Sequence, residues 1–405
     1  MSRTRSGGRT RAYRAAALTA AAALGAVPLA VAPSATADEG NPTVLSSGAG
    51  RTGQLGNGTL ADSLSPSSVT SLFRGDVDQV SAGGTSSADS FTLARTDKTV
   101  KSWGHNSSGQ LGNGGNTNQT VPTTVPRLTN VKDVAAGGRH ALALDTSGQV
   151  YSWGDNAYGQ LGNNRTGDSR TVPDRVQGMP KVKQISAGCD FSLALLENGK
   201  VYAWGRGIHG QLGTGNRATS SVPRQVTGLA DVVSIDAGCH HALALTADNT
   251  VKSWGYNLYG QLGNSSTKSS TVPVDVDWLE DVSDIEAGAF HNYVKTSDSH
   301  VWGWGNNQYG QLLEGDEAFG DNVSRTNRTA PVEIPRLEGV QHLAAGARHG
   351  VAVTADEVFA WGHNGEGQLG NGTTVSRFES VKILDEGSAV KDVAVSLGGN
   401  TTYAY

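Results

Sequence analysis

Histidine is the residue type in this sequence best suited to acid–base or metal chemistry near neutral pH, and it recurs at one fixed place. His140, His241, His291 and His349 each stand three residues after the glycine of an Ala-Gly pair. Each lies in a different segment of the chain, and no carboxylate recurs beside them. We therefore interpret the four residues as structural, buried and bonded to backbone groups, and expect no metal ion at them.

Other signatures of catalysis are absent from the sequence. It contains no nucleophile elbow, no phosphate-binding loop, no zinc-protease helix motif and no Cys-x-x-Cys pair. The sequence consequently predicts a protein that is not an enzyme and that requires no cofactor.

A loop sequence related to Trp-Gly-x-Asn-x-x-Gly-Gln-Leu-Gly occurs seven times along the chain. Its copies begin, at intervals of 50 to 57 residues, at Ser47, Trp103, Trp153, Trp204, Trp254, Trp304 and Trp361. Self-similarity at this period is typical of a solenoid, a propeller or another repeat array. Glycine, with 54 of 405 residues, is about twice as frequent as usual, which suits a chain with many tight turns.

Within one repeat, apolar residues alternate in short runs, which indicates strands joined by tight turns. In the repeat that contains Trp204, the expected strands are residues 182–188, 191–196, 201–205 and 219–226. Pro223 in the last of these fits an outer edge. Four antiparallel strands per repeat predict the blade of a β-propeller, with the small Ala-Gly pair innermost, where strands crowd around the axis.

The two ends of the chain carry complementary halves of a repeat. The chain stops after two strands of the seventh repeat, and the missing third and fourth strands are expected at residues 42–48 and 65–72. The fold class predicted is therefore all-β, a closed seven-bladed propeller in which the N- and C-terminal segments complete one shared blade.

The repeats resemble the regulator of chromosome condensation repeat family. The resemblance rests on "AGGRHALAL" (residues 136–144) followed by "VYSWGDNAYGQLG" (150–162), and on similar runs in the other repeats. It implies a seven-bladed propeller, and most members act as protein-binding discs; one is a secreted bacterial β-lactamase inhibitor. We identify the chain as a secreted bacterial-type member. It departs from the pattern in that Ser47 replaces a Trp, Leu313 replaces a Gly, and Ser90, Phe191 and Thr401 replace the usual His.

The propeller topology places the Ala-Gly turns and the Gln-Leu-Gly loops on one face, which we call the upper face. The constant Trp103, Trp153, Trp204, Trp254, Trp304 and Trp361 are expected to pack between blades, and the constant Gln to satisfy loop backbone groups. Variable positions on this face are the candidate partner-binding residues, because Tyr and Arg anchor protein interfaces. They are Arg139, Asp190, His240, Phe290 and Arg348 near the axis, and Tyr158, His209, Tyr259 and Tyr309 in the loops.

Two cysteines and one acidic loop remain after this assignment. Cys189 and Cys239 occupy equivalent places in adjacent repeats, close enough near the axis for a disulfide. The alternative is that they are two small buried residues. The loop of residues 314–329 is interpreted as a solvated insertion that touches the partner, because its acidic spacing matches no calcium loop.

Residues 1–37 differ in composition from the rest of the chain. Five arginines precede a mostly apolar run, residues 15–32, and the small residues Ala35 and Ala37 follow. This is the pattern of a secretory signal peptide cleaved after Ala37, so residues 38–405 are expected to form the propeller outside the cell. Cleavage would change the formal charge from −5 to −10, which disfavours nucleic acid. No later stretch is apolar enough to span a bilayer, and we expect a monomer.

Together these features favour an exported, non-enzymatic propeller that binds a protein partner through its upper face; inhibition of a secreted enzyme is one form of this. A first alternative is a guanine-nucleotide exchange factor-like regulator of a small GTPase, against which the apolar N-terminal run and the acidic mature charge argue. A second is an extracellular carbohydrate-binding propeller. It would need clustered carboxylates and exposed aromatics at one mouth, where the expected rim holds only Asp190.

Overall fold

The computed structural model describes residues 44–72, 77–313, 325–334, 337, 339–355, 357–384 and 390–405. These residues belong to one compact unit, Ser34–Tyr405. The predicted signal peptide, residues 1–37, and residues 314–324 of the acidic loop lie outside the described residues. Within the described ranges, no helix has the length and apolar character needed to cross a membrane.

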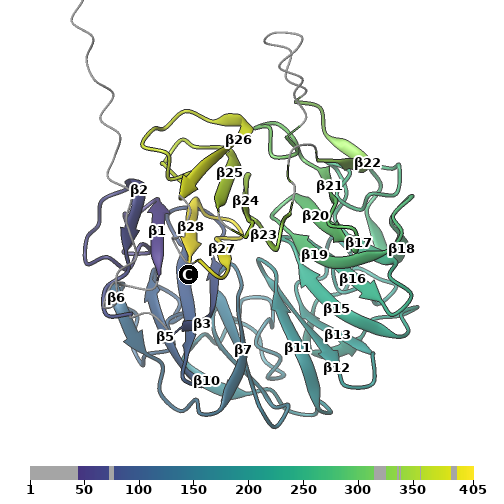
Figure 1. Ribbon diagram of the computed structural model, residues 1–405. Helices are drawn as coiled ribbons and strands as arrows, with labels where there is room; N and C mark the ends of the chain where they lie inside the picture. The colour runs from purple at the N-terminus through teal and green to yellow at the C-terminus, as the bar shows by residue number, and fades with distance from the viewer. Residues whose placement is uncertain are drawn as a thin grey trace, which may run out of the picture. The chain divides into compact units, whose positions relative to one another are not determined.

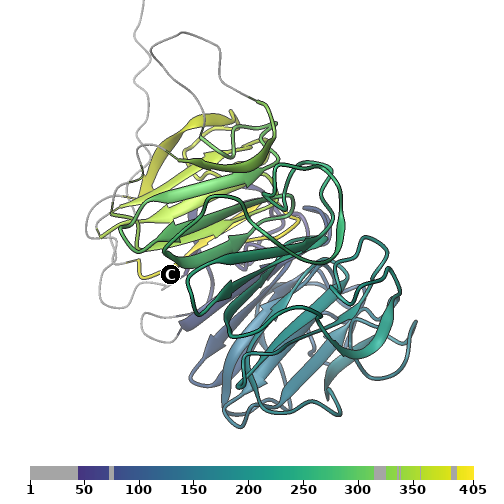
Figure 2. The ribbon, with the colours of Figure 1, turned by 90° about the vertical axis from the view of Figure 1, so that its right-hand side faces the viewer.

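The described chain forms seven four-stranded antiparallel sheets arranged in a ring (Figure 1). Sheets on the near side of the ring lie face to face when the molecule is viewed from the side (Figure 2). Each sheet is one blade, so the predicted seven-bladed propeller is confirmed.

The first four blades each consist of four consecutive strands, with the innermost strand first in sequence. Blade 1 comprises β3 (Val77–Gly83), β4 (Phe91–Thr96), β5 (Thr99–Gly104) and β6 (Gln119–Thr124). Blade 2 comprises β7 (Val131–Ala136), β8 (His140–Asp145), β9 (Val150–Gly154) and β10 (Arg170–Arg175). Blade 3 comprises β11 (Val182–Ala187), β12 (Phe191–Leu196), β13 (Val201–Gly205) and β14 (Ser220–Gln225). Blade 4 comprises β15 (Val232–Ala237), β16 (His241–Thr246), β17 (Val251–Gly255) and β18 (Ser270–Asp275).

The remaining three blades have the same order from the innermost strand outward. Blade 5 comprises β19 (Val282–Ala287), β20 (His291–Thr296), β21 (Val301–Gly305) and β22 (Arg328–Glu333). Blade 6 comprises β23 (His342–Ala345), β24 (His349–Val353), β25 (Val358–Gly362) and β26 (Arg377–Leu384). Blade 7 comprises β27 (Val393–Val395), β28 (Thr401–Ala404), β1 (Leu45–Gly48) and β2 (Ser63–Ser68).

Blade 7 is built from both ends of the described chain. Strand β1 pairs with β28 from Leu45 opposite Ala404 to Gly48 opposite Thr401. The prediction that the two termini complete one blade is confirmed, and the outer strand begins at Ser63, two residues before the expected segment.

The upper ends of the inner strands are crowded because seven of them meet around one axis. A Cβ atom added at Gly83 would lie 2.1 Å from the carbonyl oxygen of Gly137 in the next blade. One added at Gly137 would lie 2.6 Å from the carbonyl oxygen of Gly188. A side chain has no room at this place, which is the physical reason for the repeated Ala-Gly pair.

The repeated tryptophan ties each blade to the one before it. Trp103 is fully buried, and its indole N–H donates to the carbonyl oxygen of Gln54 at 2.8 Å. In blade 7 the hydroxyl of Ser47 donates to Gln368 at 3.4 Å instead, so each of the seven seams has such a bond. The other five bonds join Trp153 to Gln110, Trp204 to Gln160, Trp254 to Gln211, Trp304 to Gln261 and Trp361 to Gln311.

The four histidines are fully buried, but the expectation that they bond to backbone groups is wrong. The Nε2 atom of His140 lies 2.9 Å from the hydroxyl of Ser192 in the next blade, and this hydroxyl donates to the carbonyl oxygen of Gln160. A side chain of the neighbouring blade therefore stands between the histidine and the backbone. The equivalent pairs are His241 with Asn292 and His349 with Thr402, at 2.6 and 3.0 Å.

The histidine of blade 1 is replaced by Phe91, and the expected replacement at Ser90 is wrong. Phe91 lies opposite Gly104 in the sheet, as His140 lies opposite Gly154. The turn between β3 and β4 is longer than in the other blades, so Phe91 stands eight residues after Gly83, whereas His140 stands three residues after Gly137. Ser90 instead donates its hydroxyl to the backbone of Ser86.

The buried His291 predicts a specific pH dependence of stability. Burial lowers its pKa to about 3, so it is neutral when folded, whereas in the unfolded chain it takes up a proton below pH 6.5. Its contribution to stability is thus complete above pH 6.5 and is lost as the pH falls toward the folded-state value. We expect His291→Phe, the residue type present at this place in blades 1 and 3, to reduce the loss of unfolding free energy between pH 7.5 and pH 5 by roughly 2 kcal/mol.

Urea unfolding at the two pH values measures this difference. The exposed Leu258 provides a control, because Leu258→Phe introduces the same side chain without removing a titratable group and should leave the pH dependence unchanged. An equal loss of stability in His291→Phe and the unmodified protein would contradict the assignment.

Candidate partner-binding face

The upper face forms where two recurring features meet in each blade. We call the residue after the Trp-Gly pair the loop position, and the residue before the histidine place the rim position. The backbone amide of the loop position donates to the backbone carbonyl of the rim position. This bond measures 2.8–2.9 Å in all seven blades, in the pairs Ala49–Asn400, His105–Ser90, Asp155–Arg139, Arg206–Asp190, Tyr256–His240, Asn306–Phe290 and His363–Arg348. Both features therefore lie on one face, as the topology predicts.

Five aromatic side chains of blades 3, 4 and 5 form one cluster on this face. We call this cluster the aromatic arc, and it consists of His209, His240, Tyr256, Tyr259 and Phe290. Neighbouring rings have centroid separations of 5.0 to 6.3 Å and meet tilted or edge to face, a favourable geometry for aromatic pairs. Every ring keeps part of its surface exposed, and the exposed Ile208 and Leu258 flank the arc.

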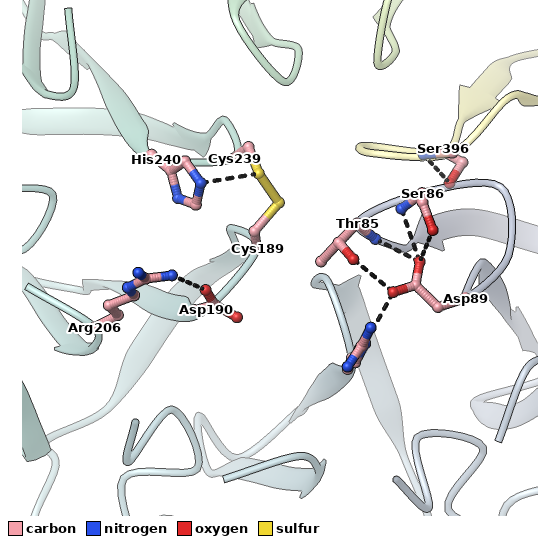
Figure 3. Close-up of a disulfide and its surroundings, with 11 residues drawn as sticks. Thr85, Ser86, Asp89, Cys189, Asp190, Arg206, Cys239, His240 and Ser396 are labelled. Carbon is pink, nitrogen blue, oxygen red and sulfur yellow. Dashed lines mark hydrogen bonds and ion pairs between the residues drawn. A yellow bond between two sulfur atoms is a disulfide. The ribbon is translucent and has the colours of Figure 1, made fainter. Parts of the chain in front are cut away.

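Two arginine–tyrosine stacks extend the arc at its ends. The guanidinium of Arg206 lies 4.7 Å from the ring centre of Tyr158, and that of Arg348 lies 5.1 Å from the ring centre of Tyr309. Arg206 also forms an ion pair with Asp190 at 2.9 Å (Figure 3). Cation–π contacts and this ion pair hold both arginines in place beside the arc.

Arg139 lies apart from this group, although its rim position makes it a candidate. Its guanidinium pairs at 2.8 Å with Asp89, a carboxylate that is almost fully buried. The backbone and side chains of Thr85 and Ser86 also donate to Asp89 (Figure 3). Arg139 thus anchors the long turn of blade 1, and the structure does not bring it to the arc.

A disulfide between Cys189 and Cys239 joins the inner turns of blades 3 and 4 (Figure 3). Their Cα atoms are 4.5 Å apart, and both side chains are buried with Ala289 and Leu397 in one apolar cluster. Phe290 of the arc packs against this cluster. The disulfide therefore supports the aromatic arc from beneath.

The glutamine side chains reveal a departure in these same two blades. In blades 1, 2, 5 and 6, the glutamine Nε2 atom bonds to the side chain at the loop position, at 2.7–3.1 Å, in the pairs Gln110–His105, Gln160–Asp155, Gln311–Asn306 and Gln368–His363. In blades 3 and 4 the loop position holds Arg206 and Tyr256. The Nε2 atoms of Gln211 and Gln261 are buried there and have no partner among the described residues.

A buried donor without a partner lowers stability by about 1–3 kcal/mol. Two of the three blades that carry the arc thus lack an internal hydrogen bond that four other blades make. In its place they present an arginine and a tyrosine on the upper face. Local sacrifices of stability of this kind are typical of functional positions.

The histidines of the arc are held in the neutral form. Burial, the nearby His209 and Arg206 lower the pKa of His240 to about 4. Burial and the charge of Arg206 likewise lower the pKa of His209. At neutral pH the arc is therefore an uncharged aromatic surface bounded by two arginines.

A cavity of about 300 Å³ inside the ring contains carboxyl groups that the sequence analysis does not include in any site. Burial raises the pKa of Asp133, Asp236, Asp284 and Glu286, and for Glu286 the charges of the other carboxyls raise it further. Among the described residues, no group of three or more His, Cys, Asp or Glu side chains is placed to hold a metal ion. These carboxyls line the ring, whereas the aromatic arc lies on the upper face.

Four of the predicted residues, His209, His240, Tyr259 and Phe290, meet in the arc, and Tyr158, Tyr309, Asp190 and Arg348 lie in the stacks beside it. The candidate set from the sequence does not include Arg206 and Tyr256. The signal that could have found them is the loop position itself. The residue at this position differs between repeats. In blades 1, 2, 5 and 6 it bonds to the glutamine amide, and in blades 3 and 4 it does not.

A family model described as the RCC1-like domain matches residues 37–404. The chain belongs to this family. The resemblance seen in the repeats is thus confirmed, while a secreted bacterial-type member stays a prediction.

Relatives of this RCC1-like domain chain have varied roles and match it over part of their length. The ultraviolet-B receptor UVR8 of Arabidopsis thaliana is 33% identical over 179 residues, which cover 43% of this chain and 40% of the receptor. The human E3 ubiquitin-protein ligase HERC2 is 35% identical over 173 residues, which cover 42% of this chain and 4% of the ligase. The mouse regulator of chromosome condensation is 36% identical over 108 residues, or 26% of each chain. The matched segments span less than half of each of these relatives.

Solved structures show the same fold over most of the chain. Yeast RCC1 (Prp20), in a structure with bound Kap60, has a TM-score of 0.78 at 24% identity and covers 91% of this chain and 89% of its own. Human WBSCR16 has a TM-score of 0.75 at 25% identity, with coverage of 89% and 98%.

The unpaired amide of Gln261 predicts that Asn is a better residue than Ala at position 256. Asn306 accepts the equivalent bond in blade 5 at 2.7 Å, so Tyr256→Asn should restore it in blade 4. We expect Tyr256→Asn to be more stable than Tyr256→Ala by about 1 kcal/mol in denaturant unfolding, because both variants lose the ring and only one gains the acceptor.

Leu258 serves as the control for this comparison, since its exposed side chain lies in the same loop. Leu258→Asn and Leu258→Ala should differ little. Equal stability of the two Tyr256 variants would show that the amide of Gln261 is satisfied in another way.

Proposed function

We propose that this protein is an exported, non-enzymatic RCC1-like propeller that binds a protein partner through the aromatic arc and its two arginine–tyrosine stacks. One observation carries the proposal. Blades 3 and 4 forgo the bond that the glutamine side chain makes to the loop position in blades 1, 2, 5 and 6, and place Arg206 and Tyr256 on the surface instead.

The chemistry of the face supports a protein partner. Tyrosine, arginine and phenylalanine are enriched at the centres of protein interfaces, where a few residues contribute most of the binding free energy. The arc is also organised before binding, by ring contacts, by the ion pair of Arg206 and by the disulfide beneath it. A surface that needs little ordering loses less free energy on binding.

The relatives support the same class of function. The yeast relative Prp20 is described by its structures as bound to Kap60 and as binding Gsp1p and histones. These partners belong to that protein. What we transfer is the use of the propeller as a protein-binding disc, with inhibition of a secreted enzyme as one form of it.

Export is proposed from the N-terminal sequence alone. Arginines, an apolar run and small residues follow one another in residues 1–37 in the order of a signal peptide. Outside the cell the two cysteines would meet oxidising conditions, which agrees with the disulfide of the propeller.

Capture of a partner on the mature protein tests the binding face. Mature protein should retain a partner from culture supernatant, and the combined variant Tyr259→Ala, Phe290→Ala, Arg348→Ala should bind that partner at least ten times more weakly. Exposed apolar residues away from the arc supply the matched control, Val233→Ala with Val272→Ala. A partner that binds both variants as well as the unmodified protein would exclude the arc as the binding face.

Intact-mass measurement of the protein from the medium tests export and the disulfide together. The expected mass is that of residues 38–405 less two hydrogen atoms, and reduction should restore the two hydrogens. A full-length mass found only inside cells would refute export. A mass equal to that of residues 38–405 with both thiol hydrogens present would refute the disulfide and leave export supported.

A further inference from the structure

A second cavity, of about 320 Å³, lies on the lower face, opposite the aromatic arc. The segment after β18 and the turn between β20 and β21 line it, with Trp278, Glu280, Asp281, Asp298, His300 and Trp302 among the lining residues. Its volume is at the small end of the range for small-molecule sites. None of these residues takes part in the proposed partner-binding face.

Trp278 is the most unusual residue of this cavity. Its side chain is 80% exposed, more than any other large apolar residue in the described part of the chain. Its backbone has a φ of 58°, in the left-handed region that bulky side chains avoid.

The other repeats show what the scaffold itself requires at this place. The equivalent residues between blades 2 and 3 and between blades 3 and 4 are Gly178 and Gly228, with φ values of 75° and 74°. Between blades 1 and 2 and between blades 7 and 1 they are Arg127 and Ser71, with φ values of 66° and 60°, so the place requires a left-handed backbone and is not restricted to glycine. Glycine adopts this conformation without strain, whereas tryptophan adopts it at a cost and gains no burial at this position. The fold therefore requires the left-handed backbone at this place but does not require a large exposed indole, which is consistent with a role in binding.

Trp302 provides the second indole, and its role is partly structural. It is half-buried and packs against the apolar cluster that includes Leu279 and Val282. Tyr151 and Tyr202 pack in the same way at the equivalent place in blades 2 and 3. The cavity thus has one fixed indole in its wall and one exposed indole.

The charges of the cavity decide which ligand suits these rings. Glu280, Asp281 and Asp298 contribute three carboxylates, and no Lys or Arg is among the lining residues. The Thr296 hydroxyl lowers the pKa of Asp298, which keeps this group ionised. His300 is the single basic group of the lining, and it lies 3.4 Å from the carboxylate of Glu333.

We propose that this cavity binds a small organic cation of the alkylammonium class. The faces of indole rings attract cations, and carboxylates around the rings add to this attraction. A neutral sugar could stack on Trp278 but would leave three negative charges uncompensated. This inference is independent of the proposed function, because the two sites lie on opposite faces and share no residue.

Choline and its neutral isostere 3,3-dimethylbutan-1-ol test the role of charge. Titration calorimetry on the mature protein should give a Kd for choline on the order of 1 mM and no measurable binding of the neutral alcohol. The affinity for choline should fall as salt is added, because ions screen exposed carboxylates. Equal binding of both compounds, or binding of neither, would overturn the proposal, as would a preference for neutral oligosaccharides.

Trp278→Gly is the sharpest variant, because it installs the residue that Gly178 and Gly228 show to be compatible with the fold. It should weaken choline binding at least about tenfold while the thermal midpoint stays the same or rises. Asp298→Asn should also weaken binding, and Tyr259→Ala in the aromatic arc should not. Unchanged choline affinity in Trp278→Gly would overturn the proposal even if the unmodified protein binds choline.

Discussion

The carbonyl oxygen of the repeated glutamine is the acceptor on which the ring depends. In six seams it receives an indole N–H from the next blade, and at several of them a second donor from that blade converges on it. At Gln160 this second donor is the hydroxyl of Ser192, and at Gln261 it is the side-chain amide of Asn292. Because these groups are buried, each needs its partner, and the relative position of neighbouring blades is set to within the length of a hydrogen bond.

This constraint explains why the loops of the upper face vary so little in backbone and so much in side chain. The same glutamine supplies the seam with its main chain and the loop with its side chain. Its carbonyl accepts a hydrogen bond in every blade, whereas its Nε2 atom has no partner among the described residues in blades 3 and 4. Sequence variation is therefore confined to the side chains at the loop position. Losing their bond to the glutamine weakens one loop and leaves the hydrogen bonds between blades intact.

Repetition made the fold predictable from one sequence, since seven copies supply their own alignment. The strands, their order and the closure of blade 7 all follow from comparing repeats. The partner of His140 could not be found in this way, because Ser192 lies in the next repeat and its counterparts are Asn292 and Thr402. The sequence alone does not identify Phe91 as the residue at the histidine place, because the turn before it is longer than in other blades. The pairing of Phe91 with Gly104 identifies it, and that pairing depends on two strands.

Within the candidate sites, residue type was a weaker guide than departure from the repeat. Aromatic residues in the loops can be recognised from the sequence. Arg206 and Tyr256 are identified as candidates only from the structure, which shows the glutamine amides that they leave unpaired. The sequence places Asp133 and Asp236 within inner strands, β7 and β15. Their convergence depends on the ring, which brings together residues about one hundred positions apart.

The shared blade has a consequence for how the molecule is made. Blades 1 to 6 each consist of four strands that are contiguous in sequence, so each can form as its segment emerges during synthesis or transport. Strand β1 emerges among the first described residues, yet its partner β28 is the last of the described strands. Strand β1 can pair with β2 early, but its other edge stays unpaired until β28 has been made. Closure therefore works as a latch, because among the described strands only β28 can join β1 to β27 and complete blade 7.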